Sequence, residues 1–221
     1  GQIALKHELR FHVDGCVGGM YLPFAKELGY DIPDFDMSVP GVTQLSMDFH
    51  KWGYAAKGAS CILYKDRAIR RYQIFSYANW TGYAVINPGV TSTKGGGPIA
   101  ACWAILRHLG RDGYLRLVDA AQSASRKIVD AVAEIDGLEV MGKAQINMLA
   151  LRATDFDIFP LSDEMKDRGW FIQPQFGFAN SSEKGFGRCC RCGTGTRVFL
   201  DHQSRPAPSP RRGSEVFDAG Q

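Results

Sequence analysis

The sequence contains no hydrophobic run long enough to cross a membrane. Its longest uninterrupted apolar stretch covers residues 99–106, whereas a transmembrane helix needs about 20 apolar residues. The amino-terminal residues also lack the basic segment and following apolar segment of a secretory signal peptide. We therefore expect a protein without a membrane span that resides in the cytoplasm.

An excess of charge of one sign is also missing from most of the chain. The formal net charge is +3 at pH 7, and basic and acidic side chains balance up to residue 182, so the whole excess lies in residues 183–221. Nucleic-acid binding needs a clustered stripe of Lys and Arg, and we expect no nucleic-acid partner. Hydrophobic residues make up 45% of the 221 positions, which excludes a wholly disordered chain and allows a real core.

The cysteines lack the spacing of a disulfide framework or a structural metal site. Cys16, Cys61 and Cys102 lie singly in apolar surroundings, which predicts small buried hydrophobes. The remaining cysteines cluster in residues 189–192, and His202 follows them. Adjacent cysteines with one following histidine do not match the paired ligand spacing of structural zinc. We expect no metal.

Apolar periodicity predicts an α/β arrangement in the first half of the chain. One predicted strand, residues 60–64, is an almost continuous apolar run, which is typical of a strand covered on both faces. Residues 76–97 are rich in Gly, Asn, Ser, Thr and Pro, and a loop of this length in a compact domain is usually functional. Helices are predicted at residues 20–28 and 99–109, and strands at residues 10–14, 43–47 and 60–64.

The second half of the chain predicts a small α+β unit. Helical spacing runs from residue 113 to Gly137, with Asp112 as the expected cap. Beyond about residue 182 the apolar periodicity disappears, and the sequence becomes rich in Pro, Arg and Cys. This composition predicts a disordered or frame-shifted tail. Further strands are predicted at residues 138–141, 147–152 and 170–173, and a helix at residues 161–168.

Three features follow predicted strands and combine into one kind of site. Asp14 ends the first strand, Lys51 follows the second, and residues 94–97 form a Lys-Gly-Gly-Gly segment. In open α/β sheets ligands bind beyond the carboxyl ends of strands. The three features together indicate a pyridoxal phosphate site. Its carboxylate would hold the pyridine nitrogen, its lysine would form a Schiff base, and its backbone amides would hold the phosphate. Each feature alone is commonly a turn or a solvated side chain.

Two strings make this interpretation specific. Residues 12–19 read HVDGCVGG and residues 46–58 read SMDFHKWGYAAKG, followed by a Gly pair and the helix start WAIL at residues 103–106. They resemble the signatures of the group II pyridoxal-phosphate-dependent decarboxylases, in particular the sphingosine-1-phosphate lyase-like members and their bacterial relatives. The resemblance extends from about residue 11 to about residue 176.

The resemblance implies an α/β fold of the aminotransferase-like fold type I, with a partial large domain and a small C-terminal α+β domain. It also implies a homodimer with its sites at the interface. Because family members have a long segment before the Asp14 strand, the chain is interpreted as a fragment that lacks this amino-terminal part. The expected division is residues 1–110 for the large domain, 111–136 for a connecting helix, 137–182 for the small domain and 183–221 for the tail.

The resemblance also assigns roles to individual residues. Lys51 would form the Schiff base, Asp14 would pair with the pyridine nitrogen, and His50 would lie near the cofactor phosphate. Lys57 would assist proton transfer or meet an anionic substrate. Lys94 stands where the lyases carry an arginine in a loop that reaches the partner subunit's phosphate, and it lacks the planar fork of arginine. The expected catalytic residues are Lys51, His50 and Lys57, and the expected cofactor-binding residues are Lys51, Asp14, His50, Gly15, His12, Thr93, Lys94 and Gly95.

These roles imply a pyridoxal-phosphate-dependent carbon–carbon lyase that acts on a small amine or amino-acid substrate. Loss of carboxylate would make it an amino-acid decarboxylase, and cleavage between the α and β carbons would make it an aldehyde lyase. The alternative is a non-catalytic fragment or interaction protein that retains the scaffold without a competent cofactor site.

Overall fold

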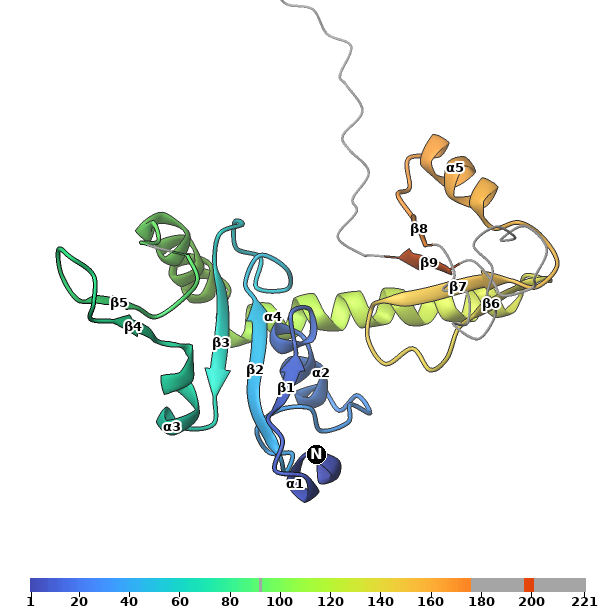
Figure 1. Ribbon diagram of the computed structural model, residues 1–221. Helices are drawn as coiled ribbons and strands as arrows, with labels where there is room; N and C mark the ends of the chain where they lie inside the picture. Colours follow the sequence, from blue (N-terminus) through green and yellow to red (C-terminus); the bar gives the residue numbers. More distant parts are fainter. Residues whose placement is uncertain (92, 176–196, 201–221) are drawn as a thin grey trace, which may run out of the picture. The chain divides into compact units, whose positions relative to one another are not determined.

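The computed structural model describes residues 1–91, 93–175 and 197–200, and the chain divides into two compact units, Gly1–Ala120 and Ala121–Gln221 (Figure 1). The first unit contains, in chain order, α1 (Gln2–Lys6), β1 (Phe11–Asp14), η1 (Gly18–Met20), α2 (Leu22–Glu27), β2 (Val42–Asp48), β3 (Ser60–Tyr64), α3 (Arg67–Arg70), η2 (Arg71–Gln73), β4 (Phe75–Tyr77), β5 (Val85–Asn87) and most of α4 (Gly96–Ala133).

The first sheet has the order β1-β2-β3, and its pairing decides where the strand ends meet. β1 runs parallel to β2, while β3 runs antiparallel to β2. Val42 and Leu45 of β2 are buried, and His12 and Asp14 are the exposed positions of β1. The carboxyl ends of β1 and β2 therefore lie at the same edge of the sheet, together with the first residue of β3.

An aromatic core packs directly behind this edge. The rings of Trp52 and Tyr21 meet edge to face with their centres 4.7 Å apart, and both side chains are buried. Tyr114 of α4 stacks on Phe24 of α2 at 5.1 Å. The Tyr114 hydroxyl donates a hydrogen bond of 2.9 Å to the carbonyl oxygen of Gly53. The turn after β2 is thus packed against two helices.

The helix α4 is interrupted at Gly110, whose φ of 56° and ψ of −176° are not helical. This break confirms the prediction of two successive helices. It falls at a glycine because only glycine adopts this backbone conformation readily. The prediction that Asp112 caps the second helix is wrong, since the break lies two residues earlier. Asp112 instead lies in the first turn after the break, where the positive end of the helix dipole stabilises a negatively charged carboxylate.

Two further predictions for the first unit need correction. Residues 60–64 do form β3, but Ile62 and Leu63 are exposed, so in this chain the strand is not covered on both faces. Residues 76–97 are not one irregular loop, because β4 and β5 pair antiparallel in this segment. Its Gly- and Asn-rich composition conceals the short strands, which flank the turn at residues 78–84.

The second unit contains a sheet of order β6-β7-β9-β8 with antiparallel pairing throughout. The predicted strands at residues 138–141 and 147–152 and the predicted helix at residues 161–168 are confirmed, whereas the third strand starts three residues later than residue 170. The elements are β6 (Leu138–Val140), β7 (Leu149–Ala153), α5 (Phe159–Asp167), β8 (Gln173–Gln175) and β9 (Arg197–Leu200).

A small hydrophobic core holds the second unit together. It is formed by Val132, Leu151, Ile158 and Ile172, and the Ser162 hydroxyl donates to the Ile172 carbonyl oxygen at 3.0 Å. Residues 197–200 are not disordered as the tail prediction allowed, because β9 pairs with both β7 and β8. The other residues of the predicted tail lie outside the described residues.

Within the described ranges no helix combines the length and the apolar character that a transmembrane span requires.

Replacing Trp52 with Ala should lower the free energy of unfolding by about 3–5 kcal/mol, because losing a buried aromatic ring leaves a cavity. Equilibrium urea denaturation measures this change. Trp103→Ala is the matched control: Trp103 is 67% exposed, and surface substitutions change stability by about 0.5 kcal/mol or less. Equal losses in the two variants would contradict the anchoring role of Trp52.

Candidate functional site

The common edge of the first sheet gathers the polar side chains that end β1 and β2. Asp14 is paired in register with Ser46, and Asp48 with Ser60. The Ser46 hydroxyl donates to Asp14 Oδ1 at 3.4 Å, and the Ser60 hydroxyl donates to Asp48 Oδ1 at 2.6 Å. His12 Nε2 lies 3.1 Å from Ser46 Oγ. Neighbouring strands thus connect these side chains in one polar network.

Lys51 lies in the turn that follows β2 and is paired with Asp48. Its Nζ is 3.0 Å from Asp48 Oδ2, and His50 Nε2 is 3.8 Å from the same oxygen. The side chain of Lys51 is 34% exposed and that of Asp48 is 19% exposed. One carboxylate therefore faces both basic side chains from the strand end that precedes them.

The thiol of Cys16 lies between the lysine and the carboxylate of β1. The Cys16 side chain helps to raise the pKa of Lys51 and to lower the pKa of Asp14, while the Cys16 carbonyl oxygen accepts from the Asp48 amide at 3.2 Å. Cys16 is half-buried. The prediction that it is only a small buried hydrophobe is wrong, because its neighbours in space are charged although its neighbours in sequence are apolar.

The ionisation of these groups follows from their hydrogen bonds. The Cys16 amide, which donates to Asp14 Oδ1 at 3.0 Å, and then the Cys16 thiol lower the pKa of Asp14 below its ordinary value. Hydrogen bonding to Cys16 and then to Asp48 raises the pKa of Lys51 despite partial desolvation. Partial burial raises the pKa of Asp48, but the hydrogen bonds from Ser60 and Lys51 outweigh it, so the net shift is downward. At neutral pH the edge holds two carboxylates and an ammonium.

Gly15 and His50 add two features of shape to this edge. A Cβ atom at Gly15 would lie 2.8 Å from the Ser46 carbonyl oxygen, so only glycine fits without a backbone shift. The Nδ1 atom of His50 is buried and has no hydrogen-bond partner among the residues that the structure describes. A buried ring nitrogen without a partner is costly, and it marks a place where a ligand group can bind.

The remaining predicted site residues are not joined to this network. Lys57 is exposed in the loop before β3, and Thr93, Lys94 and Gly95 are exposed before α4. These two segments approach each other through Gly58, where an added Cβ would lie 2.9 Å from Pro98 Cγ. The structure therefore brings together His12, Asp14, Gly15, His50 and Lys51, and it places Lys57, Thr93, Lys94 and Gly95 outside their hydrogen-bond network.

Sequence reasoning missed two members of the site, Cys16 and Asp48. The signal for Asp48 was present, because it ends a strand at the edge that holds Asp14 and precedes Lys51 by three positions. No set of three or more potential metal-ligating side chains occurs in the part of the chain that the structure describes. The Cys-rich segment at residues 189–192 and His202 lie outside that part.

Comparisons with known proteins place the chain among lyases and decarboxylases. It is 41% identical over 172 residues to the sphingosine-1-phosphate lyase of Arabidopsis thaliana, covering 78% of this chain and 32% of that protein. It is 31% identical over 176 residues to a probable L-aspartate decarboxylase of Pyrococcus furiosus, covering 80% of this chain and 47% of that protein. No family model matches the chain.

A solved structure shows the same relationship in three dimensions. The sphingosine-1-phosphate lyase of Burkholderia pseudomallei superimposes with a TM-score of 0.78 and 36% identity, covering 94% of this chain and 44% of that one. The chain thus spans about a third to a half of the length of these relatives. The fold is the predicted fold type I, present as part of the large domain followed by a small α+β domain.

Replacing Asp48 with Asn should lower the pKa of Lys51, because it removes one of the groups that hold the ammonium charged. Titration of the isotopically methylated lysine amine by NMR measures this shift. The folded-state pKa of Asp48 is depressed, so its contribution to stability is present at neutral pH and lost as the pH falls through that pKa. The variant should be about 1 kcal/mol less stable at neutral pH and indistinguishable in strong acid.

Asp130→Asn is the control for this titration, because Asp130 is exposed on α4 and forms no ion pair with a described residue. An unchanged Lys51 titration in Asp48→Asn would contradict the pairing.

Proposed function

We propose that this chain carries the lysine-bearing part of the active site of a carbon–carbon lyase. The proposal is supported by its homology to the sphingosine-1-phosphate lyases and to a pyridoxal-phosphate-dependent decarboxylase. The substrate would be a small amine or amino acid. The observation that carries the proposal is that Lys51, paired with Asp48 at the end of β2, and the ionised Asp14, at the end of the parallel strand β1, lie at one sheet edge.

The residues at this edge fit pyridoxal phosphate. Lys51 would hold the cofactor through its amine, and the lowered pKa of Asp14 keeps its carboxylate ionised for a protonated pyridine nitrogen. The buried, unpartnered Nδ1 of His50 offers a hydrogen-bonding group to a bound ligand. Gly15 lets β1 lie tightly against the Ser46 backbone beside Asp14, and His12 contacts Ser46, which in turn donates to Asp14.

When bound, the cofactor would supply an electron sink for the bond that breaks at the amine-bearing carbon. The chain's own residues would control charge and protons around that bond. Asp14 stays ionised because the Cys16 amide donates to its carboxylate and lowers its pKa. Lys51 and His50, both within 4 Å of Asp48 Oδ2, are the groups placed to hold and move a proton. The orientation of the substrate decides whether carboxylate or an aldehyde leaves.

Lys57 and the segment Thr93, Lys94 and Gly95 are proposed to act from outside the network. Lys57 would meet the substrate or assist proton transfer, and the segment would supply amides and a positive charge to a phosphate. All four are exposed, which supports contact with a ligand or with a second subunit rather than a role in the core.

The proposed domain division agrees with the compact units. Residues 1–110, proposed as the carboxyl-terminal part of the cofactor-binding domain, lie within the first unit, and residues 137–182, proposed as the small domain, lie within the second. The proposed connecting helix at residues 111–136 corresponds to the part of α4 after the Gly110 break. Residues 183–221 are proposed as the tail, apart from the strand β9.

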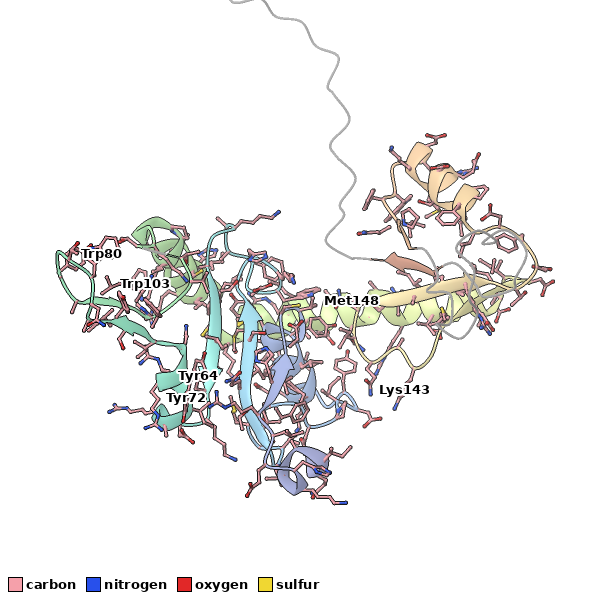
Figure 2. All side chains as sticks on the ribbon, viewed as in Figure 1. Tyr64, Tyr72, Trp80, Trp103, Lys143 and Met148 are labelled. Atoms are coloured by element: carbon pink, nitrogen blue, oxygen red, sulfur yellow. The ribbon has the colours of Figure 1, made fainter. Side chains whose placement is uncertain are left out.

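We also propose that two copies of the chain associate through the β4–β5 hairpin. The hairpin exposes large apolar side chains on both of its faces, with Phe75 and Tyr77 on one face and Ile86 on the other, and exposed apolar surface of this kind marks an interaction site. Figure 2 shows Trp80 at the far end of this hairpin. The segment with Lys94 directly follows the hairpin. The exposed side chains are Phe75, Tyr77, Trp80, Tyr83 and Ile86.

The alternative, a scaffold without a competent cofactor site, is not favoured. A chain that had lost this chemistry would be free to lose the hydrogen bonds that keep Asp14 ionised and Lys51 paired, and both are present.

The labelling of Lys51 by the cofactor tests the proposed function. After incubation with pyridoxal phosphate and reduction with borohydride, peptide mass analysis should find the modification chiefly at Lys51, and Lys51→Ala should abolish it. Lys127→Ala is the matched control, since Lys127 is exposed on α4 outside the site. Label scattered over exposed lysines, or retained in Lys51→Ala, would mean that the chain keeps only the scaffold.

The proposed dimer is tested by sedimentation velocity. Ile86→Glu, at a position 72% exposed in the single chain, should convert the dimer to a monomer without changing the circular dichroism, because a buried unpaired carboxylate opposes association. Ile135→Glu, at an exposed site of the second unit, should remain dimeric. A wild-type chain that sediments as a monomer at every concentration would refute the dimer.

A further inference from the structure

A group of basic side chains lies at the end of the first sheet opposite the candidate cofactor site. Arg10 directly precedes β1, and Lys65, Arg67, Arg70 and Arg71 follow the end of β3. We refer to these five residues as the basic cluster. Because β1 ends and β3 begins at the site edge, the start of β1 and the end of β3 lie at the other edge of the sheet.

An aromatic ring joins the two parts of the basic cluster. The guanidinium carbons of Arg10 and Arg71 lie 4.2 Å and 4.9 Å from the centre of the Tyr72 ring, which is a favourable cation–π distance. Arg71 Nη2 also donates a hydrogen bond of 3.1 Å to the Tyr72 hydroxyl. Tyr72 therefore holds two arginines from distant parts of the sequence close together.

The basic cluster carries five positive charges, and Asp66 is the one carboxylate within residues 65–71. In residues 1–91, 93–175 and 197–200, none of the five side chains takes part in an ion pair. Asp66, the acidic residue within this segment, accepts a hydrogen bond of 2.7 Å from the Ile69 amide through Oδ1 and caps α3. Close like charges repel one another, so an anion bound among them would lower the energy of this arrangement.

A hollow adjoins the basic cluster and gives the anion a place to lie. It has a volume of about 320 Å³ and is lined by Ile62, Leu63 and Tyr64 of β3 and by Lys65, Asp66, Arg67 and Arg70, three basic side chains and one carboxylate. Ile62 and Leu63 are both exposed. The hollow thus combines an apolar wall with positively charged side chains.

We propose that the basic cluster binds a phosphate group, carried by a phospholipid headgroup or free in solution. Guanidinium groups present paired N–H donors that match phosphate oxygens, and charge-assisted hydrogen bonds of this kind are strong. The positive charges of Arg71 and Arg10 already act on the Tyr72 hydroxyl, where the hydrogen bond from Arg71 and then these charges lower its pKa. The site is separate from Lys51 and does not depend on the proposed function.

The two sources of phosphate are distinguished by two measurements on the full chain. Co-sedimentation with phosphatidylcholine vesicles containing phosphatidic acid measures lipid binding, with pure phosphatidylcholine vesicles as the reference. Isothermal titration with inorganic phosphate measures free anion binding. The test variant is Arg70→Gln/Arg71→Gln, and the matched control is Arg107→Gln/Arg116→Gln, which removes the same charge from exposed positions of α4.

We expect the test variant to bind the phosphate-bearing probe about tenfold more weakly, since charge-assisted hydrogen bonds are lost, and the control variant to bind like the wild type. Tyr72→Leu keeps every charge but removes the ring that holds Arg10 and Arg71 together, and it should also weaken binding. This variant separates an organised site from general electrostatic attraction. Added salt should weaken binding by screening.

Every outcome decides the proposal. Loss of vesicle binding in the test variant supports a lipid source, and loss of inorganic phosphate binding alone supports a free anion. Equal weakening in the test and control variants, binding to polyglutamate or RNA but to neither phosphate probe, or no binding to either probe would overturn it. Borohydride labelling of Lys51 should be the same in the test variant and the wild type, so failure here is distinguishable from failure of the proposed function.

Discussion

The burial of Trp52 is the constraint on which the candidate site depends. Its ring packs against Tyr21 and fixes the chain one residue after Lys51. The turn is held equally closely by Gly53, where an added Cβ would lie 2.5 Å from the Phe49 carbonyl oxygen. Tyr54 completes it with a left-handed φ of 57°, a strained conformation for a residue with a side chain. The lysine is therefore presented by a rigid turn rather than by a mobile loop.

Much of the first sheet could be predicted from the sequence, because its strands are short apolar segments bounded by polar residues. The predicted strand at residues 60–64 has the bounds of β3, and Gly29 and Gly110 adopt positive φ where the predicted helices end. The hairpin of β4 and β5 could not be predicted in the same way. Its strands are only three residues long and lie among Gly and Asn, so their pairing depends on neighbours that periodicity does not reveal.

The candidate site was predictable where its residues end strands. Asp14 and Lys51 were expected at one edge because parallel neighbours share that edge, and β1 and β2 are parallel. Cys16 was not predictable as a member of the site, since its backbone bonds to Asp14 and Asp48 depend on the turn that follows β1. The basic cluster could not be predicted from the sequence, because Arg10 lies far from Arg71 in sequence and the net charge of the whole chain is small.

The spacing of the hydrogen bonds around the site also bears on how the chain folds. Thr43 and Phe11, which join β2 to β1, are 32 residues apart, and Ser60 and Asp48, which join β3 to β2, are 12 residues apart. The contact from Tyr114 to Gly53 closes a loop of 61 residues. Shorter loops lose less entropy on closing. The edge that bears Asp14, Asp48 and Lys51 can therefore assemble from nearby segments before α4 docks behind it.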